Sequence, residues 1–161
     1  MSRALILFTL LLTLAASLPA HAGGKATNFT VRDINGKYVR LSDFKKQAVL
    51  LNFWATWCKP CMVELKHLQK LYDKYKSKGF VVLAVSMDGP ETAAKVKPFV
   101  RRYKLTFPVV IDNETRIVKL YNSKHAAPFS VFIKQGRVVK TREGFQVSDL
   151  PAIEKEIKDL L

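Results

Sequence analysis

The sequence has 161 residues and a formal net charge of +14, a length that suits one domain with a full hydrophobic core. Nucleic acid is the first partner that such a charge suggests, but no nucleic-acid-binding motif accompanies it. The chain has two cysteines, and a structural zinc site would need two further ligands that no other cysteine supplies. We therefore expect a single domain that binds neither nucleic acid nor a structural metal.

The N-terminus has the pattern of a secretory signal peptide. Arg3 is followed by an apolar stretch at 4–18 and by Pro19-Ala-His-Ala22, which has the small-x-small ending of a cleavage site, an order typical of a segment that is cleaved on export. An uncleaved membrane anchor is the alternative, although the apolar stretch falls short of the ~20 residues that a spanning helix needs. We predict a signal peptide at 1–22, one domain at 23–161, and a periplasmic location where a disulfide can persist.

Residues 29–55 predict a hairpin followed by a buried strand. Two short runs, 29–34 and 37–41, flank the pair Asn35-Gly36, which is the strongest short-range signal for a tight hairpin turn. Residues 42–47 predict a short turn. The nearly unbroken apolar run at 48–55 has the length and composition of a central strand.

The cysteines, Cys58 and Cys61, come directly after that strand. Apolar residues then recur at three- and four-residue steps as far as residue 76, which predicts an amphipathic helix that begins at the cysteines, with Pro60 in its first turn. The helix N-terminus and the neighbouring Lys59 stabilise a thiolate. Cys58 is therefore the predicted nucleophile, and Cys61, one turn later, is the thiol that resolves a mixed disulfide.

A purely structural role is the alternative for this cysteine pair. A disulfide that closes so short a loop stabilises a fold by only about 2 kcal/mol in the chain-entropy model. A redox role is therefore the stronger interpretation of the pair.

The rest of the chain predicts alternating strands and helices. Gly79 ends the helix, and the order strand, helix, strand implies parallel neighbours joined by a right-handed crossover. The remaining predicted elements are a strand at 80–87, a helix at 90–103, a strand at 107–111, a helix at 114–121, strands at 130–134 and 137–141 with Gly136 in their turn, and a C-terminal helix at 149–161 capped by Ser148.

Residues 53–61, Phe-Trp-Ala-Thr-Trp-Cys-Lys-Pro-Cys, resemble the active site of thioredoxin-like thiol-disulfide oxidoreductases of the exported TlpA/ResA type. The resemblance spans roughly residue 27 to the C-terminus. It implies an α/β thioredoxin-like fold with a mixed central sheet, helices on both faces, an N-terminal β-hairpin and a short strand-helix insertion at 87–121. One position departs from thioredoxin itself, because Asn52 stands in place of a buried aspartate and cannot relay a proton.

The resemblance also implies the substrate contacts. Pro128 matches the family's cis-proline at the start of a strand facing the cysteines, where it offers no amide to the sheet. The backbone of Ala127 can then pair with an incoming substrate segment. Trp57, beside the nucleophile, is the third expected contact.

Glu64 is the last predicted site residue. Counting 100° per residue places it in the apolar stripe of the helix, one turn after Cys61 and facing the sheet. We expect burial to raise the pKa of Glu64, and Glu64 and Cys61 to share a proton. The TlpA/ResA type has a glutamate at the same place. The alternative is a side chain that bends out to solvent near the helix start.

The expected function is thiol-disulfide exchange on exported proteins, without a cofactor, by a monomer. The resemblance favours a reductant that a membrane donor resupplies with electrons, with apocytochrome c among the substrates of the family. Lys59 opposes this direction, because a stabilised thiolate makes the disulfide more oxidising.

A copper-binding metallochaperone is the rival from another class. Two thiolates and an imidazole suit copper, and His125 would be the third ligand beside Cys58 and Cys61. Such chaperones separate their cysteines by three residues, whereas this chain separates them by two.

The basic residues, which are dispersed over helix faces, favour a solvated surface over one that attracts acidic partners or anionic membrane.

Overall fold

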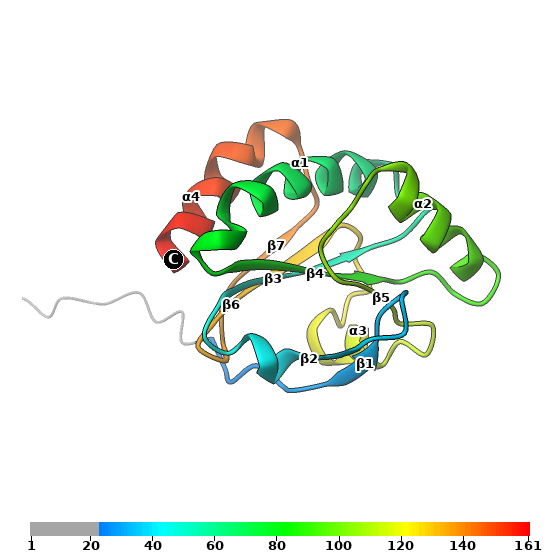
Figure 1. Ribbon diagram of the computed structural model, residues 1–161, viewed down its shortest axis with the longest axis horizontal. Helices are drawn as coiled ribbons and strands as arrows, with labels where there is room; N and C mark the ends of the chain where they lie inside the picture. The colour runs from blue at the N-terminus through cyan, green and yellow to red at the C-terminus, as the bar shows by residue number, and fades with distance from the viewer. Residues whose placement is uncertain (1–22) are drawn as a thin grey trace, which may run out of the picture.

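A computed structural model describes residues 23–161, and the predicted signal peptide lies outside the described residues. Five strands form one sheet in the order β5-β4-β3-β6-β7, and β1 pairs with β2 in a separate hairpin (Figure 1). The strands are β1 Thr30–Arg32, β2 Tyr38–Arg40, β3 Ala48–Trp54, β4 Phe80–Ser86, β5 Val109–Ile111, β6 Phe129–Lys134 and β7 Arg137–Glu143. The helices are α1 Lys59–Tyr75, α2 Val96–Arg102, α3 Arg116–Tyr121 and α4 Leu150–Leu160.

Two hydrophobic cores, one on each face of the sheet, follow from the alternation of side chains along the strands. Leu50 and Trp54 of β3 belong to the core that also contains residues of α1, α2 and α4, whereas Leu51 and Phe53 belong to the core that contains residues of β2 and α3. Figure 1 shows the same division, with α1, α2 and α4 on one side of the sheet and α3 with the hairpin on the other. The predicted thioredoxin-like α/β fold is confirmed.

The central strand and the following helix lie where the sequence predicts them. Every residue of β3 is buried, and the strand pairs in parallel with β4 and antiparallel with β6. Cys58 is the N-cap of α1. Gly79 ends the helical segment with a φ of 90°, a left-handed conformation that glycine adopts without a steric penalty.

The insertion between β4 and β6 differs from the prediction in its helix and strand starts. The helix predicted at 90–103 is a 3₁₀ turn at Ala93–Lys95 followed by α2. Pro98 explains the late start, because a proline has no amide for the helix interior and is tolerated only in the first turn, where it lies. The strand predicted from 107 begins at Val109, since Pro108 cannot donate to the sheet. The carbonyl of Pro108 instead accepts the amide of Ala84 at 3.0 Å.

Two further helix starts also differ. The helix predicted from 114 begins at Arg116, where the Asp112 carboxylate accepts the amides of Arg116 and Val118. Ser148 does not cap α4, because it lies inside the 3₁₀ turn Val147–Asp149, and Asp149 accepts the backbone amide of Gln146. An aspartate therefore sets the start of α3, and another closes the 3₁₀ turn that precedes α4; the sequence pattern reveals the partner amides of neither. None of the helices in residues 23–161 has both the length and the hydrophobicity of a membrane-spanning segment.

Candidate active site

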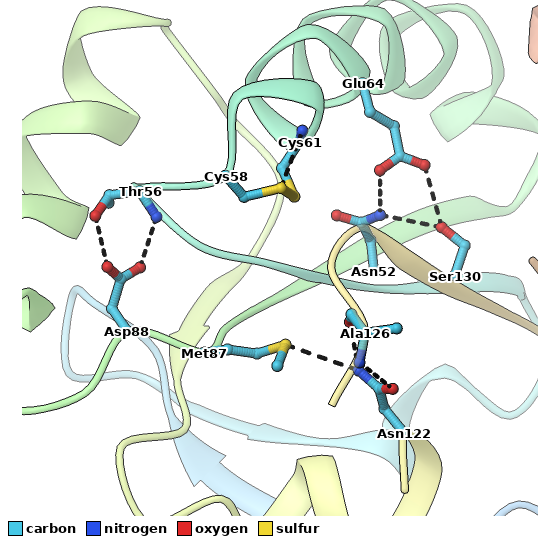
Figure 2. Close-up of a disulfide and its surroundings, with 10 residues drawn as sticks. All are labelled: Asn52, Thr56, Cys58, Cys61, Glu64, Met87, Asp88, Asn122, Ala126 and Ser130. Carbon is cyan, nitrogen blue, oxygen red and sulfur yellow. Dashed lines mark hydrogen bonds between the residues drawn. A yellow bond between two sulfur atoms is a disulfide. The ribbon is translucent and has the colours of Figure 1, made fainter. Parts of the chain in front are cut away.

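Cys58 and Cys61 form a disulfide between the end of β3 and the first turn of α1 (Figure 2). The amide of Cys61 donates to the sulfur of Cys58 at 3.3 Å. Cys58 is 5% exposed and Cys61 is fully buried. Trp57 and Lys59, the neighbours of Cys58, are both exposed. An incoming molecule therefore meets Cys58 first.

A buried carboxylate holds the loop that leads to Cys58. Asp88 accepts the backbone amide of Thr56 at 2.9 Å, the hydroxyl of Thr56 at 2.5 Å and the hydroxyl of Ser86 at 2.7 Å. Two of these donors belong to Thr56, so the Asp88 carboxylate fixes this residue two positions before the nucleophilic cysteine. Asp88 and Ser86 were not among the predicted site residues. The signal that could have found them is their position: Ser86 ends β4, the parallel neighbour of the strand that leads to the cysteines, and Asp88 follows two residues later.

A second buried carboxylate, that of Glu64, lies on the other side of the disulfide in Figure 2. The side chain is 3% exposed, so its predicted burial is confirmed. Asn52 donates its side-chain amide to Oε2 at 2.9 Å, and Ser130 donates its hydroxyl to Oε1 at 3.3 Å. Within the described residues no hydrogen bond joins Glu64 to Cys61, whose sulfur is held in the disulfide.

Burial sets the acidity of this carboxyl group. Desolvation raises the pKa of Glu64 to about 7, while the hydrogen bonds from Asn52 and Ser130 lower it. The rise agrees with the expectation from the helical position of Glu64. Such a group changes its protonation state near neutral pH, which a proton acceptor for a neighbouring thiol requires.

The bond between Ala127 and Pro128 is cis, as the resemblance predicts. Phe129 pairs with Phe53 at the end of β3, so Pro128 lies at the edge of the sheet from which the cysteine loop leaves. Ala127 packs against the core that contains both cysteines. The expected substrate contacts therefore lie at the same end of the sheet as Cys58.

Asn122 holds the residue that precedes Ala127. Its side-chain oxygen accepts the amide of Ala126 at 3.0 Å, and its side-chain nitrogen donates to the carbonyl of Ala126 at 2.7 Å (Figure 2). Sequence reasoning missed Asn122, because an isolated asparagine after a helix carries no pattern that indicates this contact.

The metal-binding alternative needs His125 beside the two cysteines. His125 is exposed, and no three His, Cys, Asp or Glu side chains between residues 23 and 161 come together in a way that could hold a metal ion. The structure therefore does not bring together the ligands that the copper interpretation requires.

Comparison with known proteins places the chain in a family. The model of the AhpC/TSA family matches residues 22–144. The chain belongs to the AhpC/TSA family. The thiol-disulfide oxidoreductase ResA of Bacillus thuringiensis subsp. konkukian is 42% identical over 127 residues, which cover 79% of this chain and 72% of that protein. A ResA of Bacillus cereus is 45% identical over 128 residues, with the same shares of each chain.

Solved structures of related proteins share the fold. A protein from Chlorobium tepidum assigned as thiol:disulfide interchange protein DsbE has a TM-score of 0.80 and 33% identity, and the match covers 86% of this chain and 96% of that one. The exposed lipoprotein thioredoxin Etrx1 of Streptococcus pneumoniae has a TM-score of 0.71 and 31% identity, with 83% and 100% covered. Together with the Cys58–Cys61 disulfide, these relatives identify this family member as a ResA-like thiol-disulfide oxidoreductase.

Proposed function

We propose that the protein reduces disulfides of exported proteins, with Cys58 as the attacking thiolate and Cys61 as the resolving thiol. The asymmetry of the pair carries this assignment. Cys58 caps the N-terminus of α1 and is the more exposed of the two, whereas Cys61 is fully buried. The positive end of the helix and the cation of Lys59 both favour a thiolate at Cys58.

The exchange consists of two displacement steps. The Cys58 thiolate attacks one sulfur of a substrate disulfide, which forms a mixed disulfide and releases the first substrate thiolate. Cys61 then loses its proton and attacks the Cys58 sulfur, which forms the intramolecular disulfide and releases the second substrate thiolate. Two electrons pass from the dithiol to the substrate.

Glu64 is the proposed acceptor of the Cys61 proton. It lies one turn after Cys61 on the buried side of α1, and its pKa of about 7 lets it take up a proton at neutral pH and release it again. Asn52 and Ser130 orient the carboxyl group through their hydrogen bonds. Asn52 thus supports the acid at position 64 and does not replace the aspartate of thioredoxin as a proton carrier.

Trp57, Ala127 and Pro128 are the proposed substrate contacts. Trp57 is 60% exposed beside Cys58. The backbone amide and carbonyl of Ala127 form no backbone hydrogen bond within residues 23–161, so an extended substrate segment can pair with them. Pro128 has no amide that would compete for the same segment.

We further propose cleavage of residues 1–22, a periplasmic location and re-reduction by a membrane donor. The signal-like N-terminus and the resemblance to the TlpA/ResA type support these points, as they support apocytochrome c as a substrate. Equilibration with glutathione at fixed pH measures the reduction potential of the Cys58–Cys61 pair, which bears on the direction of electron flow. A potential between ~−270 mV and ~−120 mV is expected, and a value as high as ~−120 mV, that of a strong oxidant, would contradict a reductant.

Trapping of partners tests the assignment of the two cysteines. The Cys61→Ala variant should accumulate mixed disulfides with partner proteins through Cys58, and the Cys58→Ala variant is the matched control that should not. Mass spectrometry then identifies the trapped partners. Equal trapping by both variants would overturn the assigned roles.

A further inference from the structure

Positive charge is concentrated on α1 and α2. Residues 92–111, which include α2, contain five basic residues and no acidic residue. On α1, Lys59, Val63, Lys66 and Lys70 are all exposed, and steps of four, three and four residues place them on one face of the helix. This face begins at the disulfide, because Lys59 directly follows Cys58.

Tyr103 connects the cations of the two helices. The ammonium group of Lys66 lies 4.7 Å from the centre of the Tyr103 ring, and the guanidinium group of Arg102 lies 5.8 Å from it. Gln69 of α1 also forms two 2.8 Å hydrogen bonds with Thr106, beyond α2. Figure 1 shows α1 and α2 on the same side of the sheet. We call Lys59, Lys66, Lys70 and Arg102 the cationic face.

The cationic face differs from the surface around α4 in how its charges are paired. None of its four cations forms an ion pair with a carboxylate in the part of the chain that the structure describes. Around β7 and α4, by contrast, five carboxylates each lie within ion-pair distance of a lysine or arginine: Glu143, Asp149, Glu154, Glu156 and Asp159. Lys66 and Lys70, one turn apart, repel one another. The uncompensated charge therefore opposes folding slightly and is available to a partner.

Two apolar side chains lie among these cations. Trp57, directly before Cys58, is 60% exposed, and Val63, between Lys59 and Lys66 on the same face of α1, is 40% exposed, so exposed apolar area adjoins both the redox sulfur and the cations. Interfaces between proteins have this arrangement of apolar centre and complementary charged rim. We propose that the cationic face docks an acidic segment of the partner protein next to its reacting cysteine. This inference rests on the proposed function and specifies its substrate class.

An anionic membrane is the other surface that such a charge would attract. The position of the disulfide favours the polypeptide, because a lipid surface lying on the cationic face would cover Cys58, whereas a docked polypeptide brings its own sulfur there. Among the described residues of α1 and α2, Val63 is the one large apolar side chain that is exposed. A helix that inserts into a membrane interface presents a whole apolar face.

Two synthetic peptides, each with one internal disulfide, test the proposal. One peptide carries glutamates on either side of the disulfide, and its matched control carries glutamines. The fully reduced protein should reduce the glutamate peptide about tenfold faster at low ionic strength, because electrostatic steering raises association rates by at least this factor. In about 1 M NaCl, where the screening length falls to about 3 Å, the two rates should become equal.

Variants that replace three cationic side chains by glutamine locate the preference for the glutamate peptide on the protein surface. The Lys66→Gln/Lys70→Gln/Arg102→Gln variant should reduce both peptides at the rate at which the wild type reduces the glutamine peptide. A control with the same loss of charge is Lys45→Gln/Lys46→Gln/Lys134→Gln. These lysines lie at the opposite end of β3 from the disulfide, where Lys134 pairs with Ala48, so this variant should keep the preference.

The outcomes separate the docking proposal from the proposed function. Equal rates for both peptides at low ionic strength in the wild type would overturn the docking proposal and leave the exchange reaction intact. Failure to reduce either peptide would overturn the proposed function. Equal peptide rates combined with binding to phosphatidylglycerol vesicles, lost in the first triple variant, would assign the cationic face to a membrane and also overturn the proposal.

Discussion

Two buried carboxylates lie on either side of the disulfide, and their surroundings differ (Figure 2). Asp88 accepts three hydrogen bonds, one of them from the backbone of the cysteine loop. Glu64 accepts two, both from side chains, and desolvation raises its pKa to about 7. One acid therefore anchors the loop, whereas the other can exchange a proton at neutral pH.

The cluster around Glu64 is also incompletely hydrogen-bonded. The side-chain oxygen of Asn52 is buried and has no donor within the described residues. A buried acceptor without a partner destabilises the fold, and such groups in native proteins call for a functional or structural reason. Around Asp88, by contrast, no buried side-chain nitrogen or oxygen of Asp88, Thr56 or Ser86 lacks a hydrogen-bond partner within the described residues. The fully hydrogen-bonded Asp88 cluster therefore stabilises the fold, whereas the Glu64 cluster is suited to proton exchange.

The largest expected effect comes from removing the anchor. The Asp88→Ala variant leaves the amide and hydroxyl of Thr56 and the hydroxyl of Ser86 without their acceptor, which should lower the free energy of unfolding by about 4 kcal/mol. Urea denaturation measures the loss. Asp43→Ala, at an exposed aspartate, is the control and should change stability by less than about 0.5 kcal/mol. A loss as small in Asp88→Ala would contradict the anchoring role.

The second effect is a dependence of stability on pH. The pKa of Glu64 is raised from 4.5 to about 7 in the folded protein, so folding is favoured most when the group is protonated, below pH 4.5. Between pH 4.5 and pH 7 the unfolded chain has lost this proton while the folded protein still holds it, so the free energy of unfolding should fall by about 3 kcal/mol relative to Glu64→Gln, with the loss complete above pH 7. Denaturation of both oxidised proteins at pH 4.5 and pH 8 gives this difference. A difference that stays constant would contradict the raised pKa.

The third effect concerns the release step. In Glu64→Gln the Cys61 thiol loses its proton acceptor, so resolution of the mixed disulfide should slow about a hundredfold near neutral pH. Attack by Cys58 should keep its rate. The pKa of Cys61 should fall, because no negative charge opposes its thiolate. Single-turnover mixing measures both steps, and unchanged resolution with unchanged cysteine titrations would return Glu64 to a structural role.

The smallest effect is expected from Ser130→Ala. The hydrogen bond from Ser130 lowers the pKa of Glu64, so its loss should raise the pKa and reduce stability by about 1 kcal/mol. Ser130→Thr keeps a hydroxyl and should restore the wild-type titration. An unchanged or lowered pKa in Ser130→Ala would show that the hydroxyl does not contact the charged form.

Sequence reasoning located the parts of the site that rest on local pattern. The run of β3, the cysteine pair and the helical spacing of Glu64 are each read over a few consecutive residues. Asp88 and Ser130 could not be found in this way. Their partners lie 32 and 66 residues away, and the contact of Ser130 depends on the register that pairs it with Asn52.

The fold was predictable to a similar extent. The helix predicted at 90–103 is present but begins late, at Val96, because periodicity does not show which turn can accept Pro98. The strand at Val109–Ile111 was shortened by Pro108. Long apolar runs define elements, whereas their ends depend on prolines and on side chains such as Asp112 that cap from elsewhere.

The contrast between the two carboxylates is tested most directly by the titration of Glu64 itself. Carbon-13 NMR of the side-chain carboxyl carbon in the oxidised protein, assigned with the Glu64→Gln variant, gives the midpoint. A midpoint of about 7 is expected, because desolvation outweighs the hydrogen bonds from Asn52 and Ser130. A midpoint near 4.5, the ordinary value, would contradict the assignment of Glu64 as the proton acceptor.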